Sequence, residues 1–421
     1  MSDVLTISYC LRLEVPLKFF ILSIYILCLP LFAVLSFESN HAKEVKLLRT
    51  FDINPSFLND ARLNIISEQK RSLYKNKYFF KTMNEAYIFI PLVKKIISDA
   101  DVPSEILYLA MAESNFSTRA YSKKKASGMW QFMPYTGRIY GLKIDDYVDE
   151  RRDLVKSTEA AVRYLGYLNR KFGKWYLAAI AYNCGEGRLK KAIKKAGTDD
   201  LEVLLDAKKK YIPAESRRYI RKIIALALLG HDEGYMIDNE CDYLLNRGNA
   251  YSLATVNVPA GESLEHIAKL ISMPVTELKK LNRHLKYNFV PPYGDEYSIY
   301  LPYIKLSEFK TKYKPAELQT MYLVHTVSSG DNLSYLGKKY GIPYGRIKDF
   351  NKLRSDSLSL KQKLIIPVSK AYKPRKMHYT VKNGDTLDSI SKLFKLTVAD
   401  LKKINRLRTD MIRIGDKLSV H

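Results

Sequence analysis

A single carboxylate, Glu113, lies on the apolar face of a predicted helix, inside the stretch AMAESNFSTRAYSKKKASGMWQFMP. Ile106 and Leu109 precede it at the spacing of one helix face. Burial on that face disfavours the charged form, so we expect the pKa of Glu113 to rise toward the value that a general acid needs near neutral pH. An isolated acid at a helix end more often caps the helix or pairs with a neighbour such as Arg119, so the surrounding residues must decide its role.

The cluster that follows Glu113 is small, polar and aromatic, with Gly128, Trp130, Gln131 and Phe132 close together in the chain. Farther along, four acids are candidates for a second catalytic carboxylate: Asp145, Asp146, Asp149 and Glu150. Sequence alone places none of them at the roughly 5 Å from Glu113 that a two-carboxylate glycosidase requires.

Several motifs occur in the order found in lytic transglycosylases related to goose-type lysozyme. They are E-S-x-F from Glu113, G-M-W-Q-F-M-P from Gly128, D-E-R-x-D from Asp149, A-Y-N-x-G-x-G from Ala181 and a closing E-S-R-R-Y-I from Glu215. The resemblance covers about residues 90–235. It implies a mainly α-helical, lysozyme-like catalytic domain.

The resemblance also implies a lyase that works with one acid. Glu113 would protonate the glycosidic oxygen between N-acetylmuramic acid (MurNAc) and N-acetylglucosamine (GlcNAc), while the substrate's own 2-acetamido group stabilises C1. Glu113 would then take the proton from the muramoyl O6, which closes on C1 and leaves a 1,6-anhydro end. No metal or other cofactor is implied. The alternatives are a muramidase that hydrolyses with water and a wall-binding protein without activity.

Further site residues follow from positions that match the family. The expected substrate-binding residues are Ser122, Ser127, Gly128, Met129, Gln131, Tyr182, Asn183 and Tyr219. Within this set, either Ser122 or Ser127 would orient Glu113, and Tyr182 would bond to Glu113 or to the acetamido group. Gln131 would contact the sugar, and Gly128 would permit close approach of the backbone. By the same resemblance, Trp130 and Phe132 would either stack on a sugar ring or lie in the core. The D-E-R-x-D cluster is interpreted as a loop and helix-cap network. Cys184 stands where the family commonly has alanine, and we expect activity to survive this change with some sensitivity to oxidation.

Helical patterns precede and follow these motifs. Ser104 predicts the start of a helix over residues 105–116, and Ser157-Thr158-Glu159 predicts the start of a second one over residues 160–172. Residues 175–183 are nearly all apolar, which indicates a buried helix, and residues 217–229 form the last amphipathic helix. Strand signals are scarce before residue 250.

An internal repeat follows. Residues 325–353 align without gaps on residues 379–407, and a fainter copy lies within residues 256–302. Each copy predicts a strand, a turn, two helices with an asparagine at the end of the second, and a final strand. These βααβ units resemble LysM modules, which bind GlcNAc-containing glycans. The glycan-binding residues implied are Gly330, Asp331, Asn332, Gly384, Asp385 and Thr386. The fainter copy has Glu262 at the aspartate position, which weighs against glycan binding there.

Residues 19–37 form an apolar run without charge, which predicts either an export signal or a membrane anchor within residues 1–42. Leu27 precedes Cys28, so a lipid anchor is not predicted. After export only Cys184 and Cys241 would remain, which excludes a disulfide framework. The net charge of +25 fits an anionic cell-envelope polymer, and no nucleic-acid-binding motif is present.

The predicted domains are an N-terminal helical extension, a catalytic domain, a degenerate LysM-like repeat and two LysM modules. Their boundaries are 43–89, 90–240, 250–303, 322–368 and 377–421. Segments rich in Lys and Pro, residues 311–320 and 369–376, would link the repeats. We expect a monomer in the periplasm or cell envelope whose partner is peptidoglycan.

Overall fold

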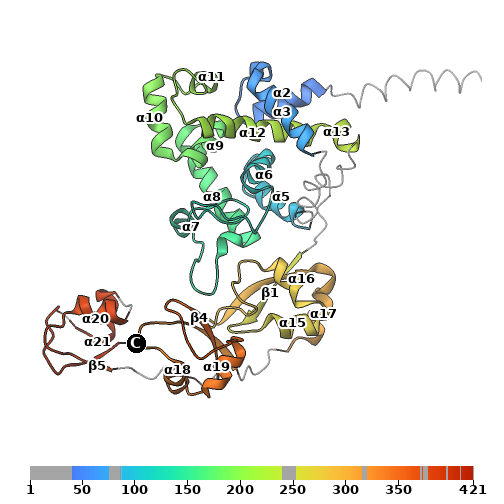
Figure 1. Cartoon of the computed structure of the whole chain (residues 1–421). Helices are drawn as coiled ribbons and strands as arrows, with labels where there is room; N and C mark the ends of the chain where they lie inside the picture. Colours follow the sequence, from blue (N-terminus) through green and yellow to red (C-terminus); the bar gives the residue numbers. More distant parts are fainter. Residues whose placement is uncertain are drawn as a thin grey trace, which may run out of the picture. The chain divides into compact units, whose positions relative to one another are not determined.

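The computed structural model describes residues 40–74, 86, 88–238, 253–314, 320–369, 372, 378–394, 397–407 and 409–420 (Figure 1). Most of the predicted export signal or anchor, residues 1–39, and Cys241 lie outside the described residues. Within the described part, none of the helices is both long enough and apolar enough to cross a membrane. Contacts divide the chain into two compact units, and each is described by itself.

The first unit contains Met1–Tyr87, Lys94–Phe116 and Val162–Gly248, and its described residues form helices without a strand. Its complete helices are α2 (Asn40–Thr50), η1 (Pro55–Asn59), α3 (Ala61–Tyr74), η2 (Ser104–Ile106), α6 (Leu107–Ser114), α9 (Trp175–Cys184), α10 (Glu186–Ala196), α11 (Leu201–Leu204), α12 (Ala214–His231) and α13 (Glu233–Asp238). Parts of α5 (Ile90–Ser98) and α8 (Leu154–Phe172) also belong to it. The predicted buried helix over 175–183 is confirmed as α9, of which residues 176–181 are buried.

Helix α12 organises the first unit by packing against α2, α3, α6 and α9 (Figure 1). Tyr219, Ile220, Ile223 and Ile224 are buried on it, at the spacing of a helix face that contacts a core. Arg221 forms a two-bond ion pair with Asp60, with Nε–Oδ1 and Nη2–Oδ2 distances of 2.9 and 2.7 Å. This helix therefore holds Tyr219 in the interior of the unit.

Helix α6 ends directly after Glu113. The predicted helix over 105–116 forms as η2 followed by α6, and Asn115 ends it in the left-handed conformation with φ 51°. Phe116 also has a left-handed φ of 63°, which is strained for a bulky side chain. Glu113 thus lies in the last helical turn, where the negative end of the helix dipole further disfavours a charged carboxylate.

Helix α8 begins earlier than predicted. It starts at Leu154, and the side chain of Asp153 accepts a hydrogen bond from Lys156 N at 2.9 Å. Ser157 and Thr158, which we expected to cap the helix, are buried within its first turns. The prediction was wrong by about one turn because Asp153, in the preceding loop, supplies the cap.

The second unit contains Ile88–Val93, Ser117–Ala161 and Asn249–His421. Its first part carries α7 (Pro134–Ile139) and η3 (Glu150–Arg152), and the three repeats follow. The repeats consist of β1 (Leu253–Pro259), α15 (Leu264–Leu270), α16 (Val275–Leu281) and β2 (Glu296–Pro302); β3 (Thr320–Thr326), α18 (Leu333–Tyr340), α19 (Tyr344–Phe350) and β4 (Lys363–Ser369); and β5 (His378–Thr380), α20 (Leu387–Phe394), α21 (Val398–Asn405) and β6 (Lys417–Ser419). In each repeat the two strands pair antiparallel, which confirms the predicted βααβ order.

The first repeat extends farther than predicted. After β2 the chain forms η4 (Tyr303–Lys305) and α17 (Leu306–Lys312), and Phe309 of α17 is buried in the core of that repeat. The predicted linker over residues 311–320 therefore overlaps a helix at its beginning and strand β3 at its end. A short segment whose apolar residues are Leu306 and Phe309, followed by lysines, gave too weak a helical pattern to be recognised.

The asparagine at the end of the second helix forms the same clamp in all three repeats. Asn351 donates to Ile347 O at 2.8 Å and to Ile365 O at 2.7 Å, and it accepts from Ile365 N at 2.7 Å. Asn282 and Asn405 make the equivalent three bonds to their own helix and last strand. The repeated asparagine is therefore a structural residue that joins helix and sheet.

Candidate active site

Glu113 lies in a pocket of about 440 Å³ in the first unit. Ala112 and Glu113 come from the end of α6, Asn183 from α9, and Glu215, Tyr219 and Lys222 from α12. The pocket thus brings three predicted site residues, Glu113, Asn183 and Tyr219, to one place.

The ionisation of Glu113 is balanced between opposing effects. Burial is the largest and raises its pKa from 4.5 to about 7. Tyr219 opposes this by donating its hydroxyl hydrogen to Glu113 Oε1 at 2.6 Å, and the positive charge of Lys222 also favours the carboxylate. Glu215, a second carboxylate in the pocket lining, raises the pKa further. A group with a pKa of about 7 can both donate and accept a proton at neutral pH.

Asn183 and Tyr182 occupy the end of α9. The Asn183 side-chain oxygen accepts a hydrogen bond from Ser216 Oγ at 2.7 Å, which fixes the direction of its amide. Tyr182 packs against Tyr164 with ring centroids 5.2 Å apart, and burial followed by the charge of Glu113 raises its pKa. Next to them, burial raises the pKa of the Cys184 thiol, so little thiolate forms at neutral pH.

Three cationic residues of the pocket were missed by the sequence interpretation: Lys70, Arg218 and Lys222. Lys222 donates to the backbone oxygen of Ala112 at the end of α6. Burial and the nearby charge of Lys70 lower its pKa to about 8. The i, i+3 spacing of Tyr219 and Lys222 on one helix was the signal that could have found Lys222.

The predicted residues of the second motif lie in the second unit, in a loop of strained backbone. Gln131 has a left-handed φ of 48°, and its amide donates to Gly128 O at 2.7 Å. Gly128 has φ 82°, and a Cβ there would come within 1.7 Å of the Arg151 carbonyl oxygen. Glycine is therefore required by the protein's own backbone, whatever its contribution to substrate approach. The Ser122 side chain accepts from Ala126 N at 2.9 Å and closes the turn that carries the three exposed lysines.

The large side chains of the same motif are core residues. Trp130, Phe132 and Met129 are 0%, 2% and 1% exposed, and Trp130 donates to Thr158 Oγ1 at 2.9 Å. The alternative in which Trp130 or Phe132 stacks on a sugar was wrong, because neither ring reaches the surface. Ser127 is also fully buried, and its hydroxyl accepts from Arg152 Nε at 3.0 Å.

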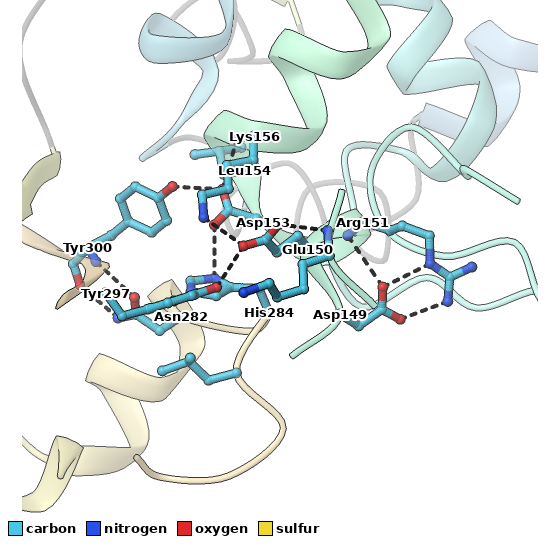
Figure 2. Close-up of polar contacts among 12 residues, drawn as sticks. Asp149, Glu150, Arg151, Asp153, Leu154, Lys156, Asn282, His284, Tyr297 and Tyr300 are labelled. Atoms are coloured by element: carbon cyan, nitrogen blue, oxygen red, sulfur yellow. Dashed lines mark hydrogen bonds and ion pairs between the residues drawn. The ribbon is translucent and has the colours of Figure 1, made fainter. Parts of the chain in front are cut away.

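The four acids considered as second carboxylates are each engaged within the second unit. Asp145 accepts from Tyr147 N and Val148 N, and Asp146 pairs with Lys363 at 2.5 Å. Asp149 forms a two-bond ion pair with Arg151, both bonds at 2.8 Å, and caps η3 (Figure 2). Glu150 accepts from Lys143 N, Lys156 Nζ and the Tyr297 hydroxyl. The predicted loop-and-cap role of this cluster is confirmed by these contacts.

The same segment is embedded in the first repeat. Val148 is fully buried in the hydrophobic core of that repeat, and Asp149 N donates to His284 O at 2.8 Å. Tyr300 donates to Asp153 Oδ1 at 2.7 Å, and His284 Nδ1 lies 3.4 Å from Asp153 Oδ2 (Figure 2). Burial lowers the pKa of His284, so the imidazole is disfavoured as a cation. Residues 143–156 therefore form one packed body with the first repeat.

Family models match three parts of the chain. The transglycosylase SLT domain matches residues 94–204, the LysM-like domain of lytic transglycosylase MltD matches residues 252–317, and the LysM domain matches residues 325–367 and 379–421. The chain is 30% identical over 380 residues to membrane-bound lytic murein transglycosylase D of Escherichia coli strain K12, a match that covers 84% of this chain and 81% of that protein. The chain belongs to this family.

Membership in the family of membrane-bound lytic murein transglycosylase D confirms the predicted enzyme class, the lysozyme-like catalytic domain and the LysM modules after it. The chain is also 41% identical over 95 residues to the cell wall-binding protein YocH of Bacillus subtilis strain 168, covering 23% of this chain and 32% of that protein. Among solved structures, the 70 kDa soluble lytic transglycosylase of E. coli matches with a TM-score of 0.30 and 19% identity, over 49% of this chain and 32% of that one.

The predicted glycan-binding residues of the two LysM modules form tight turns. Gly330 and Gly384 have φ values of 88° and 87°. Asp331 accepts from His325 Nε2 at 2.8 Å and from Ser328 N at 2.7 Å. Asp385 accepts from the Tyr379 hydroxyl and from Lys382 N. Asn332 and Thr386 follow these turns and accept from backbone N–H groups of α18 and α20. These residues therefore shape the turn.

The first repeat of this family member departs from that pattern. Glu262, at the aspartate position, is fully buried and accepts from Ser263 N and the Tyr313 hydroxyl, with His266 Nδ1 3.0 Å away. The loop before its last strand is four residues longer, because Asn282 clamps Tyr300 whereas Asn351 clamps Ile365. This longer loop contacts residues 145–149. The LysM modules instead expose Leu360 and Ile414 in that loop, at 67% and 69%.

Proposed function

We propose that this chain is an exported peptidoglycan lytic transglycosylase that cleaves the β-1,4 bond between MurNAc and GlcNAc and leaves 1,6-anhydro-MurNAc ends. The observation that carries the proposal is the state of Glu113: a buried carboxyl with a pKa of about 7, bonded to Tyr219 at 2.6 Å in a pocket. Family membership supports the reaction class.

In the first step Glu113 acts as the acid. Its proton passes to the glycosidic oxygen, the bond from that oxygen to C1 breaks, and the acetamido oxygen of the same MurNAc bonds to C1. Burial supports this step, because it keeps the carboxyl protonated near neutral pH. Tyr219 and Lys222 then stabilise the carboxylate that remains.

In the second step the Glu113 carboxylate acts as the base. It takes the proton from the muramoyl O6, O6 bonds to C1, and the acetamido oxygen leaves. Atoms balance without water, and the enzyme returns to its protonated state. The amide of Asn183 would bind the sugar, since Ser216 fixes its direction.

The two C-terminal LysM modules would hold the enzyme on the glycan. Exposed Leu360 and Ile414, near the Gly-Asp turns in the βααβ unit, offer apolar contacts to sugar rings. The first repeat, with Glu262 buried and its long loop packed on residues 145–149, would instead support residues 143–156 of the transglycosylase domain. Two weak sites joined by a linker bind more tightly than one through effective concentration.

Mass spectrometry of digested sacculi tests the reaction. The proposal expects 1,6-anhydro ends from the parent protein and no products from Glu113→Gln, which should still bind sacculi. Reducing ends would instead show hydrolysis, for which Glu215 in the same pocket offers a candidate base. Binding without any product from the parent protein would show a non-catalytic wall-binding protein. Deletion of residues 321–421 should weaken sacculus binding more than it slows the cleavage of soluble fragments.

The proposed location is the periplasm or cell envelope, with glycan strands as the partner and a monomer as the working form. The net charge of +25 supports an anionic partner, and the apolar run at residues 19–37 supports export or attachment at the membrane. Cell fractionation with and without residues 1–42 tests the location, and light scattering tests the monomer. Recovery of the full chain in the cytoplasm would contradict export.

A further inference from the structure

A second pocket, of about 570 Å³, lies entirely within the second unit. Its walls come from the loop that carries the Gly128 motif, from residues 144–152 and from the end of α16 with the long loop of the first repeat. It is lined by six cationic side chains: Arg119, Arg151, Arg152, Lys279, Arg283 and Lys286. Asp149 is the lone acid among its lining residues, and Arg151 already neutralises it through two bonds of 2.8 Å.

Three of these cations, Arg152, Lys279 and Lys286, form no ion pair with a carboxylate among the residues that the structure describes. Lys279 donates to the carbonyl oxygens of Leu285 and Tyr287, both at 2.5 Å, and Lys286 donates to Asp145 O. Arg152 bonds through Nε to Ser127 Oγ. These neutral oxygens hold the cations in place without cancelling their charge, so the cavity keeps a positive field.

Two of the lysines in the pocket have lowered pKa values. Burial is the main cause that lowers the pKa of Lys279 to about 8, with the charge of Glu265 opposing it and that of Arg283 adding to it, and burial followed by Lys363 lowers the pKa of Lys286. An anion in the cavity would relieve both effects and receive charge-assisted hydrogen bonds from preoriented donors.

We infer that this pocket binds the carboxylates of the peptide stems that branch from the glycan strand. The inference rests on the proposed function, and it names the part of the polymer that this pocket binds. Arg152 links the pocket to the predicted substrate loop, because it bonds to Ser127 and stacks over Tyr121 at 5.7 Å. Tyr121 is 57% exposed and lines the cavity, so it offers an apolar face to the stem beside the cations. Stem peptides carry several carboxylates, which matches several cations better than a single charge would.

The pocket exists because the first repeat is packed on residues 143–156 of the transglycosylase domain. Lys279, Arg283 and Lys286 come from the repeat, whereas Arg119 and Arg152 come from the catalytic part. The two halves are joined by the backbone bonds between residues 147–149 and 284–286. The degenerate repeat therefore contributes to recognition of the substrate through its basic loop.

The test uses the full chain and two substrates, glycan strands that keep their stems and strands from which an amidase has removed them. The variant is Arg119→Gln/Arg283→Gln, and the matched control is Lys269→Gln/Lys310→Gln, which removes two exposed charges of the first repeat outside the pocket. We expect the variant to raise KM about tenfold on strands with stems and to change it less than about twofold on bare strands, with the control unchanged on both.

A binding measurement separates the possible anions. A free stem tripeptide should bind the parent protein and lose about tenfold in affinity in the variant, whereas a peptide with amidated carboxylates should not bind. Equal KM values for variant and parent on both substrates would overturn the inference while leaving the cleavage reaction intact. Binding of inorganic phosphate in preference to the tripeptide would also overturn it. Failure of the parent protein to cleave either strand would contradict the proposed function itself.

Discussion

Replacing Glu113 by glutamine is expected to stabilise the first unit at alkaline pH and, if the proposed reaction holds, to abolish cleavage. The buried carboxyl has a pKa of about 7 in the folded protein, compared with 4.5 for an unperturbed glutamate. The amide of Glu113→Gln has the shape of the protonated acid and can accept the same hydrogen bond from Tyr219. The variant therefore removes the cost of ionising this position and keeps its packing.

The expected magnitude follows from the raised pKa. Below pH 4.5 the carboxyl is protonated in both the folded and the unfolded chain, so parent and variant should be equally stable. As the pH rises from there, the unfolded chain ionises while the folded one holds its proton, and the parent loses stability until the pH passes about 7. At about 1.4 kcal/mol per pKa unit, the difference reaches about 3 kcal/mol and then stays constant.

Urea denaturation between about pH 4 and pH 8.5 measures this difference. Trp175 begins α9 in the same unit as Glu113, so tryptophan fluorescence reports on its unfolding. Glu68→Gln serves as the matched control, because it makes the same substitution at a solvent-exposed position of α3. A Glu113→Gln variant that is equally stable at every pH, or less stable at high pH, would refute the claim that burial raises this pKa.

Four further outcomes are expected. Tyr219→Phe removes a 2.6 Å bond to the carboxylate, so the alkaline limb of the pH–rate profile should move up by about one unit; a downward shift would contradict the assigned bond. Asn351→Ala leaves two backbone groups without a partner and should cost the second repeat about 2–3 kcal/mol, seen as faster hydrogen exchange in β3 and β4. Val148→Ala should destabilise the first repeat by about 2 kcal/mol, measured by the same exchange in β1 and β2, because the side chain lies in that core. Cys184 should react with iodoacetamide much more slowly at pH 8 than in the unfolded chain, because burial raises its pKa; equal rates would contradict this effect of burial.

Local patterns predicted much of this molecule. The apolar face before Glu113, the nearly all-apolar α9 and the glycine–asparagine spacing of the repeats each depend on residues within one or two elements, so their physical basis is visible in the chain. The direction of the Glu113 pKa shift could be predicted for the same reason, because burial of the helix face is its largest cause.

Long-range contacts could not be predicted in this way. The start of α8 depends on Asp153. The side chain of Asp153 also contacts Tyr300 and His284, which lie far along the chain. Trp130 has the chemistry of a sugar platform, and only its burial in a fold assembled from distant segments shows that it is core. Lys222 was overlooked because a lysine on an amphipathic helix ordinarily faces solvent.

The burial of Val148 in the first repeat has a consequence for the order of events during synthesis. Residues 143–156 leave the ribosome more than a hundred residues before Tyr300, which completes their packing. Contacts at such separation form late, because a long loop must close before they contribute any stability. We therefore expect a nascent chain that ends before β2 to hold this segment without its packing partner. Residues 143–156 of an enzyme that degrades the wall would then be fully packed only after its first wall-binding-like repeat had been made, which delays activity until about 300 of the 421 residues have been joined.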